Sequence, residues 1–438
     1  MEEIIKILQD NTPTQSQESL LAVEQYNTTS HKVMQTQYRA NKTIYKPVLD
    51  ANGDQVEVNG EPQFRQHTVF VNRVPIPMQK NIVALRKYFM NLRGSVLYCD
   101  DDQSALLEEV NKVRKNNKYS FKIEEIAERT MSELQSAEMW WVNDKGEIKM
   151  RVLSPEKGDL LLPIFDEFGD LKYFLRSYDV DGDTYTDIFT QTENYTFNGK
   201  GELVNSWKNV WEKIPIIYYE QEEPEWADVQ NLIERYETLL SNFGDNVDYT
   251  GNPITVVKGQ IQGYAAKEDS GKVLQLESDA DIKYLTADGA PEAVALEMRT
   301  LKEDMYRYSH TPDMSIESLK GNAVSGVAFD RLFTDAQLSA EGKLSGTFGE
   351  SMQRSVNLVS AMVRSVNRGL PDDIIEIETN AYRFDDLETF VKNAVLLKGI
   401  LSNETLTKLM AGKYGIVPAE EWERVRVELG TAVIEDFS

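Results

Sequence analysis

The segment YRYSHTPDMSIESLKGNAVSGVAFDRL, from Tyr306 to Leu332, decides how the rest of this sequence is interpreted. Its first residues continue a helical pattern that ends near residue 309, and its last residues begin another at about residue 325. Polar residues, glycine and proline are concentrated between these points, as is typical of a loop. The segment therefore predicts a helix end, a loop over residues 310–324, and the start of a second helix.

The glycines of this loop raise the question of nucleotide binding. Gly321 and Gly326 have the spacing of a phosphate-binding loop, which requires Lys directly after the second glycine. The residue at that place is Val327, and no strand is predicted before the loop. We therefore expect no ATP site here, and an assembly subunit without catalytic residues rather than an enzyme.

Two amphipathic helices are predicted upstream of the loop, at residues 227–252 and 291–309. Apolar residues recur at helical spacing in the first helix, and a heptad-like seam runs along the second. The residues expected to pack are Leu232, Tyr236, Leu239, Met298, Leu301 and Met305. The intervening residues 253–290 contain three short β-rich runs and are too few to fold alone. One interpretation is an ordinary helical hairpin with a decorated tip, and the other is a rod that packs against other copies of the chain.

The longest helical pattern follows the loop, at residues 325–369, where alanine, leucine, phenylalanine and valine recur every four residues. Gly342, Gly346 and Gly349 lie in its middle, and each glycine weakens a helix by about 0.5–1 kcal/mol relative to alanine. We therefore predict one long helix with a bend at these glycines.

The two ends of the chain complete a helix-rich α+β fold. Residues 1–226 read as helices followed by antiparallel strands, with hairpin turns at Asn52-Gly53 and Asn59-Gly60. Ser104 and Ser120 are expected to cap helices at about 104–117 and 122–138. Residues 370–438 read as a short strand followed by acidic helical segments.

Composition and charge exclude several classes of protein. The 438 residues carry a net charge of −25, whereas a free nucleic-acid binder usually presents a basic face.

The single cysteine, Cys99, allows no disulfide within the chain and is expected to be buried. The three histidines are far apart in the sequence, so neither a metal site nor a cofactor is expected. Asp179–Asp183 has the look of a calcium loop with its glycine misplaced, and a hairpin turn is expected there. Neither a signal peptide nor a membrane span is expected.

The segment from about 215 to 365 resembles the portal proteins of tailed double-stranded-DNA bacteriophages, in particular the stem, clip, wing and crown type found in siphophages. Residues 306–313 are similar to the Tyr-x-x-Ser-x-Thr-Pro-Asp/Asn ending of that family's second stem helix. Four stretches carry the resemblance: IPIIYYEQEEPEWADVQNLIERYETLLSNFGDNVDYTGNPITVVKG (214–259), DIKYLTADGAPEAVALEMRTLKEDMYRYSHTPDMS (281–315), GNAVSGVAFDRLF (321–333) and PEKGDLLLPIFDEFGDLKYFLRSY (155–178).

The resemblance implies a role for each part of the chain. It implies a ring, of about twelve copies, at one capsid vertex of the virion, assembled in the host cytoplasm and passed by double-stranded DNA during packaging and ejection. The partners implied are the terminase large subunit, a head-completion or adaptor protein, and the major capsid and scaffolding proteins. The parts implied are a wing (1–226), stem helix 1 (227–252), a clip (253–290), stem helix 2 (291–309), a tunnel loop (310–324), a long kinked helix (325–369) and a crown (370–438).

The loop 310–324 would then face the DNA, with Ser318, Lys320 and Asn322 as the candidate contacts. Lys320 is the only basic residue among residues 311–324. It either makes transient contacts with phosphates or is simply a solvated lysine, and the sequence favours neither. An acidic channel wall would repel DNA and keep contacts weak, so that DNA can slide.

Two other classes of function remain open at this point. The first is a different structural protein of a phage head or baseplate. The second is an enzyme of nucleic-acid metabolism without a recognisable motif, which would need clustered His, Asp or Cys residues that the sequence does not show.

Overall fold

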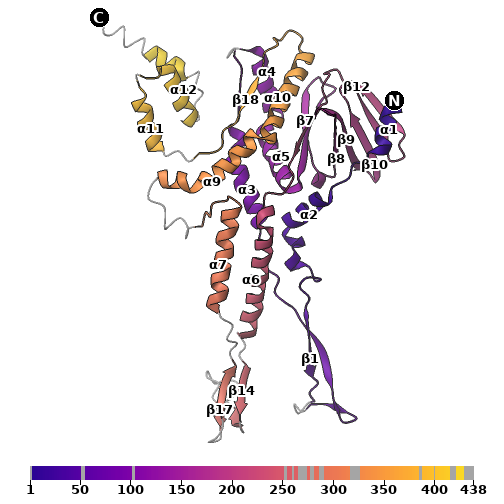
Figure 1. Ribbon diagram of the computed structural model, residues 1–438, viewed down its shortest axis with the longest axis vertical. Helices are drawn as coiled ribbons and strands as arrows, with labels where there is room; N and C mark the ends of the chain where they lie inside the picture. The colour runs from indigo at the N-terminus through magenta and orange to yellow at the C-terminus, as the bar shows by residue number, and fades with distance from the viewer. Residues whose placement is uncertain are drawn as a thin grey trace. The chain divides into compact units, whose positions relative to one another are not determined.

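The computed structural model shows a helix-rich α+β fold divided into two compact units (Figure 1). The first unit comprises Met1–Pro312 and Leu338–Ala381, and the second comprises Asp313–Gln337 and Tyr382–Ser438. The structure describes residues 2–428 except 51–54, 101–103, 251–253, 259–260, 265–273, 277–280, 286–290, 316–325, 384–386, 399 and 415–420.

Two antiparallel sheets form the body of the first unit, as the alternating sequence predicted. One sheet has the strand order β12-β11-β10-β9-β8 and the other the order β13-β6-β7. The strands are β6 (Gln135–Val142), β7 (Ile148–Leu153), β8 (Leu160–Phe165), β9 (Leu171–Val180), β10 (Asp183–Phe189), β11 (Glu193–Asn198), β12 (Leu203–Lys208) and β13 (Ile216–Glu220). The turn between β9 and β10 contains Asp181 and Gly182, both at positive φ, so the predicted hairpin at Asp179–Asp183 is confirmed.

The hydrophobic core joins the two sheets. One shared cluster combines Ala137 and Leu153 of the smaller sheet with Leu161, Phe174 and Phe189 of the larger one. A second cluster lies under the N-terminal helix α1 (Glu2–Asp10), whose Ile4 packs against the larger sheet. The sheets and α1 therefore form one packed body.

Helices surround the smaller sheet, with α5 packed on β6 and α10 on β13 (Figure 1). Ser104 caps α4, as predicted, by accepting a hydrogen bond from the Leu107 amide. The prediction that Ser120 caps the next helix is wrong, because α5 already begins at Tyr119, after Lys118 in the left-handed conformation. The elements around this sheet are α2 (Gln17–Tyr26), η1 (Thr28–Ser30), η2 (Lys32–Met34), α3 (Met78–Met90), η3 (Leu92–Gly94), β5 (Val96–Tyr98), α4 (Ala105–Asn116), α5 (Tyr119–Glu133), η4 (Pro155–Lys157) and α10 (Thr347–Val366).

A long helical hairpin extends from this body. After the short turn η5 (Ala227–Val229), α6 (Gln230–Thr250) packs along α7 (Pro291–Tyr308). Between the two helices, the three β-rich runs of the sequence become two strand pairs. These pairs are β14 (Ile254–Lys258) with β17 (Asp281–Leu285), and β15 (Ile261–Tyr264) with β16 (Leu274–Leu276).

A second projection, here called the ribbon, is formed by residues 42–69. Its two long strands, β1 (Lys42–Pro47) and β4 (Phe64–Val69), pair in antiparallel fashion. At its tip β2 (Glu57–Val58) pairs with β3 (Glu61–Pro62) across Asn59 and Gly60, which both have positive φ. The predicted turn at Asn59-Gly60 is confirmed, and the one at Asn52-Gly53 lies outside the described residues.

The long helical pattern after residue 325 forms two helices instead of one bent helix. Helix α9 (Gly326–Ser345) ends and α10 begins at Thr347, with Gly346 in an extended conformation between them. Gly342 lies within α9 and Gly349 in the first turn of α10. A Cβ atom at Gly349 would overlap the carbonyl oxygen of Leu344 and lie 2.8 Å from its carbonyl carbon. The two helix ends can therefore approach this closely only where residue 349 has no side chain.

The C-terminal part of the chain is shared between the units. Residues 370–381, which the sequence assigned to the C-terminal region, lie in the first unit, where β18 (Glu376–Glu378) pairs with β5. The second unit contains α11 (Leu387–Leu396), α12 (Asn403–Tyr414) and helical residues 421–428. Among the described residues, no helix has the length and apolar content needed to cross a membrane.

Substitution by alanine is expected to have opposite effects on stability at two of the glycines near the helix break. Gly349→Ala should destabilise the first unit by about 1–3 kcal/mol, because the added methyl group forces the helix ends apart. Gly342→Ala should stabilise it by about 0.5–1 kcal/mol, since nothing lies within 4 Å of the added Cβ and alanine is the better helix former. Urea unfolding of both variants measures the difference, and equal midpoints would contradict the role given to Gly349.

Candidate functional site: the helical hairpin and its junction

The residues predicted to pack the helical hairpin do lie on its two helices. Leu239 of α6 and Met305 of α7 are buried, whereas the other predicted positions are partly exposed. These partly exposed residues are Leu232, Tyr236, Met298 and Leu301. Arg235 of α6 donates two hydrogen bonds to Glu297 of α7, at 2.9 and 2.8 Å, on the surface of the hairpin. Phe243 of α6 and Leu296 of α7 are exposed apolar residues.

A buried carboxylate fixes the start of the hairpin to the body. The Glu225 carboxylate accepts a hydrogen bond of 3.0 Å from Arg86 Nε, and both side chains are only 5% exposed. The same carboxylate pairs with Lys343, whose Nζ also donates to Gln221 at 3.2 Å. Arg86 Nη2 donates to the carbonyl oxygen of Ser309, at the end of α7. Helices α3, α7 and α9 therefore meet at Glu225.

A second buried carboxylate, Glu237, fixes the middle of α6. His31 Nδ1 lies 2.6 Å from Glu237 Oε1, and the amide of Ile76 donates to the same oxygen at 2.8 Å. His31 Nε2 lies 2.8 Å from the carbonyl oxygen of Gln25. Burying a carboxylate is costly unless it is hydrogen-bonded, and here two groups contact it.

The lower part of α6 holds the base of the ribbon. Arg39 forms an ion pair of 2.6 Å with Asp245, which also accepts a hydrogen bond from the Asn72 amide at 2.7 Å. The Asn72 side chain donates to Asp248 at 2.7 Å. Arg39 precedes β1 and Asn72 follows β4, so both strands of the ribbon are held at one point on α6.

Helix α10 is held by a third buried carboxylate, Glu138 of β6. Its oxygens accept hydrogen bonds from Tyr119 at 2.9 Å, Tyr219 at 2.7 Å, Trp140 at 2.7 Å and Ser355 of α10 at 2.5 Å. Burial raises the pKa of the Glu138 carboxyl, although these donors act in the opposite direction. One carboxylate therefore connects α5, β6, β13 and α10.

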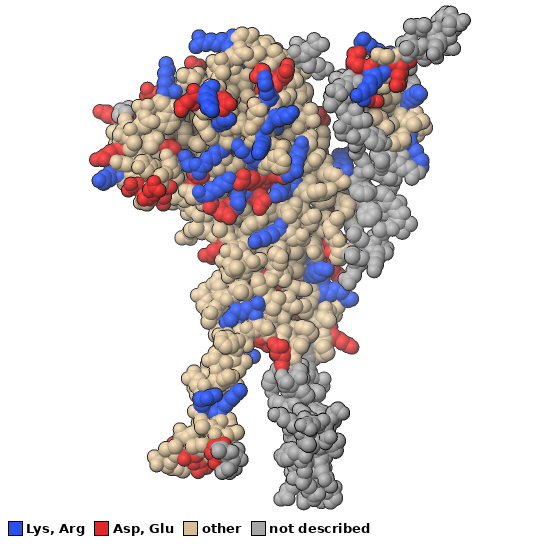
Figure 2. Space-filling view, turned by 180° about the vertical axis from the view of Figure 1, so that it is seen from behind, with Lys and Arg blue, Asp and Glu red and all other residues tan. Residues whose placement is uncertain are grey.

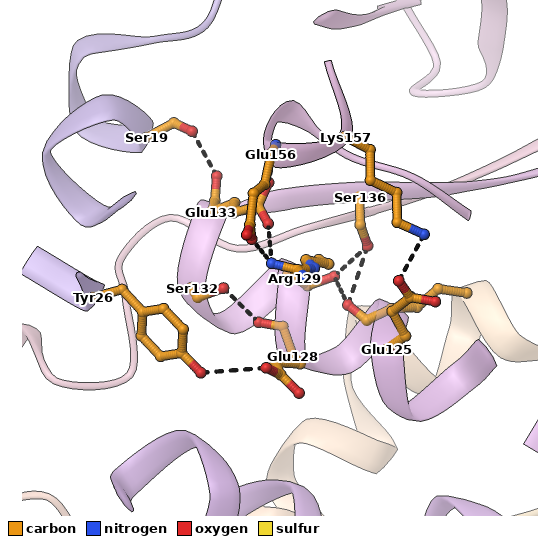
Figure 3. A network of polar contacts seen from close by, with 12 residues as sticks. Ser19, Tyr26, Glu125, Glu128, Arg129, Ser132, Glu133, Ser136, Glu156 and Lys157 are labelled. Carbon is orange, nitrogen blue, oxygen red and sulfur yellow. Dashed lines mark hydrogen bonds and ion pairs between the residues drawn. The ribbon is translucent and has the colours of Figure 1, made fainter. Parts of the chain in front are cut away.

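A further polar network lies around the end of α5 (Figure 3). Arg129 lies between Glu133, at 3.2 Å, and Glu156, while Lys157 pairs with Glu125 at 2.6 Å. The amide of Glu156 donates to Glu133 at 2.9 Å. Burial nevertheless raises the pKa of Glu133 to about 7, and Arg129 only partly opposes this effect.

The first unit also contains an open cleft of 1770 Å³ bordered by α1, the β8–β9 turn and the start of α10. Its lining mixes carboxylates such as Glu3 and Glu350 with bases such as Lys213 and Arg354. Across the part of the chain that the structure describes, no group of three or more His, Cys, Asp or Glu residues is arranged to hold a metal ion. Cys99 is buried, as predicted.

The other predicted site residues fall at the helix break or outside the described residues. Gly346 separates α9 from α10, with Gly342 and Gly349 on either side. Ser318, Lys320 and Asn322 lie outside the described residues.

Sequence reasoning missed Glu138, Glu225 and Glu237, because 72 Asp and Glu residues made any single carboxylate uninformative. Two of them carried a usable signal. Glu237 lies four residues after Ile233 and three before Leu240, so it interrupts the apolar face of α6. Glu138 stands among buried positions of β6 beside Trp140. Glu225 lies in an irregular segment without periodicity, so no local pattern could have identified it.

A small change at Glu225, in this junction, is expected to have a large effect on stability. Glu225→Gln keeps the shape of the side chain but leaves Arg86 buried without its counter-charge, so the free energy of unfolding should fall by about 3 kcal/mol. The matched control is Glu350→Gln, in the exposed pair with Arg354, which should change stability by less than about 0.5 kcal/mol. Similar losses for both variants in urea unfolding would show that Glu225 does not anchor the hairpin.

Glu133 predicts a pH dependence of stability. Its pKa of about 7 in the folded state exceeds the usual value of 4.5, so the folded state retains a proton that the unfolded state has lost. Stability should therefore fall as the pH rises from 4.5 to 7, by up to about 3 kcal/mol from this group. Glu133→Gln should reduce that slope by the contribution of this group, as measured by thermal unfolding across this pH range.

The control for this experiment is Glu128, on the same helix. Burial acts to raise the pKa of Glu128, but the ion pair with Lys87 and the hydrogen bond from Tyr26 outweigh it and lower the pKa. Its contribution is lost only as the pH falls below about 4.5. Glu128→Gln should therefore leave the slope between pH 5 and 7 in place, and loss of the slope in this variant would contradict the assignment to Glu133.

Comparison with known proteins places this architecture in a family. The family model described as phage portal protein, SPP1 Gp6-like, matches residues 17–433. The portal protein of Bacillus phage SPP1 is 20% identical over 336 residues, which cover 69% of this chain and 62% of that protein. The chain thus matches less than two thirds of the length of this relative.

Chains of gene transfer agent particles are among the solved structures that match this chain. The neck of the empty particle matches with a TM-score of 0.40 and 14% identity, covering 78% of this chain and 91% of the other. The virion of the native particle matches with a TM-score of 0.40 and 13% identity over the same shares. Because the family model spans nearly the whole sequence, the chain belongs to the SPP1 Gp6-like family of phage portal proteins.

Proposed function

We propose that the chain is a portal subunit whose copies form a ring of about twelve at one vertex of a phage capsid. Double-stranded DNA would pass through the ring during packaging and ejection. The observation that carries this proposal is the family match along residues 17–433, which includes the helical hairpin, the following loop and the two helices after it. The protein would act in the virion, after assembly in the host cytoplasm, as a structural subunit without catalytic activity.

The helical hairpin supports the ring. Helices α6 and α7 cover each other only in part, and Phe243, Leu296 and Tyr308 remain exposed apolar residues. Apolar side chains on a projecting rod favour contact with further copies, because association removes them from water. In the ring, α6 and α7 would form the stem, and residues 1–226 together with α9 and α10 would form the wing.

The tip and the C-terminal region would carry the partners of the ring. Residues 253–290 would form the clip, which binds the terminase large subunit during packaging and a head-completion or adaptor protein afterwards. Residues 370–438 would form the crown on the capsid side, near the major capsid and scaffolding proteins. The net charge of −25 supports weak contacts with DNA, since an acidic surface repels phosphates and lets DNA slide.

The loop 310–324 would face the passing DNA, with Ser318, Lys320 and Asn322 as its contacts. The end of α7 before the loop supports this assignment, because Arg86 binds the Ser309 carbonyl oxygen and also pairs with the buried Glu225. Lys320 would supply a transient phosphate contact that salt weakens.

Ring formation is the deciding measurement. Purified protein examined by mass photometry and negative-stain microscopy should give closed rings with a central hole, both alone and under capsid-assembly conditions. Monomers under both conditions would contradict the portal proposal, and an open or sheet-like assembly would favour another head or baseplate structural protein. Rings carrying Lys320→Ala should still form but package DNA more slowly, and unchanged packaging would remove Lys320 from the DNA contact.

A further inference from the structure

The ribbon is a surface feature that the proposed function does not explain. Every residue of β1 and β4 is exposed, including Tyr45 at 68% and Phe64 at 54%. A two-stranded ribbon with both faces in water is at best marginally stable. Its base is nevertheless held firmly on α6 by Arg39, Asn72 and Asp245. A firmly held ribbon with exposed aromatic residues needs a surface to pack against.

The register of the two strands separates charge from apolar surface. Residues directly opposite each other in an antiparallel pair point to the same face, and successive residues alternate between faces. Tyr45 is opposite Gln66 and Pro47 is opposite Phe64, whereas Lys46 is opposite Arg65. The uncharged face consists of Thr43, Tyr45, Pro47, Phe64, Gln66 and Thr68, and the basic face consists of Lys42, Ile44, Lys46, Arg65, His67 and Val69.

The basic face is unusual in so acidic a chain. Lys46 and Arg65 are directly opposite each other, which destabilises a strand pair, and β1 and β4 contain no carboxylate. None of the described carboxylates forms an ion pair with Lys42, Lys46 or Arg65. Figure 2 shows the ribbon at the lower left, with Lys and Arg along its length and Asp and Glu gathered at its tip.

The helical hairpin has the opposite charge. Helices α6 and α7 carry eight carboxylates (residues 234, 237, 245, 248, 292, 297, 303 and 304) and four bases (residues 235, 299, 302 and 307), a net charge of −4. Strands β1 and β4 carry three bases and no acid, a net charge of +3 without His67. Both surfaces also carry exposed apolar residues. On the hairpin, Phe243 is 43% exposed and Leu296 is 55% exposed.

We propose that the uncharged face of the ribbon packs on the helical hairpin of a second copy of this chain, against residues 240–250 and 291–298. This inference rests on the proposed ring. Cyclic symmetry relates copies by rotation alone, so parts at one height along the axis meet parts at the same height. The base of the ribbon is held at Asp245 on its own α6. If the helical hairpin runs along the axis of the proposed ring, the surface that the next copy presents at that height is the end of α6 and the start of α7.

Through this contact the ribbon of each copy would bind the helical hairpin of its neighbour. Burial of Tyr45 and Phe64 against Phe243 and Leu296 supplies apolar contact. The basic face points away from this contact, so the opposite net charges add only a longer-range attraction that salt screens. The base of the ribbon is held on α6 of its own copy, and its target is the equivalent hairpin of the next copy. The contact therefore extends the interface between neighbouring hairpins instead of forming a separate one.

Cross-linking between two single-cysteine preparations tests the contact. With Cys99→Ala as the background, Tyr45→Cys in one preparation and Leu296→Cys in the other should give a disulfide-linked dimer when the two are mixed, assembled and oxidised. Because each copy carries one cysteine, this product can arise only between copies. Lys46→Cys is the matched control, since it is the next residue on the same strand but on the opposite face, and its yield with Leu296→Cys should be several-fold lower.

A second variant measures the strength of the contact. Tyr45→Ser together with Phe64→Ser changes only exposed residues, so the monomer should unfold as the wild type does. The concentration needed for ring assembly should rise on the order of tenfold or more, because two aromatic contacts are lost.

The possible outcomes separate this inference from the proposed function. If wild-type protein forms rings but Tyr45→Cys cross-links no better than Lys46→Cys, the ribbon does not pack on the neighbouring hairpin, and another protein or DNA is its partner. Rings of the double serine variant that assemble at the wild-type concentration would overturn the inference in the same way. If wild-type protein forms no ring at all, the proposed function fails and this inference fails with it.

Discussion

The ion pair between Glu225 and Arg86 holds together segments that are far apart in the sequence. Arg86 binds the carbonyl group of Ser309, the residue directly after α7, and Glu225 precedes α6. Lys343, near the end of α9, pairs with the same carboxylate. Both helices of the hairpin and the helix beyond the loop therefore share one buried charge cluster. A positively charged guanidinium at the C-terminal end of α7 also complements the dipole of that helix. The orientation of the helical hairpin relative to the two sheets depends on this cluster.

An acidic chain uses some of its carboxylates as internal connectors. Glu138, Glu225 and Glu237 are each buried, and each is contacted by groups from other segments of the chain. Removing a carboxylate from water is expensive, so such groups contribute little net stability but penalise any arrangement that leaves them unpaired. Each one therefore fixes the relative placement of elements whose apolar contacts alone would tolerate shifts. Burial raises the pKa of Glu133 as it does that of Glu138, and the ion pair of Glu133 with Arg129 only partly opposes this effect.

Local patterns predicted the elements of this fold better than their ends or their connections. Asn59-Gly60 and Asp181-Gly182 form the expected turns because positive φ at a hairpin is a property of the two residues themselves. The end of α5 was misplaced because residues 135–142 pair with β7 and β13, and that distant pairing overrides helical preference. The glycines at 342, 346 and 349 predicted a weak point, but a helix pattern cannot distinguish a bend from a break. The break lies at Gly346, whose backbone is extended, and the close approach of Gly349 to Leu344 across it leaves no room for a side chain at residue 349. The Arg86–Glu225–Lys343 cluster joins residues 139 and 118 positions apart and leaves no periodic trace in the sequence.

The two ends of the segment between Ser309 and Lys343 are held in different ways. On the α7 side, buried Arg86 binds a main-chain carbonyl group, which residue 309 would present whatever its side chain. On the α9 side, the tie is the side chain of Lys343, which is 29% exposed and lies three residues before Gly346. A partly exposed lysine is more easily released than a buried arginine, because water can replace its partner. If the loop that we propose faces DNA changes its conformation, we infer that the change starts from the α9 side, where the tie is a partly exposed lysine, while the end of α7 stays in place.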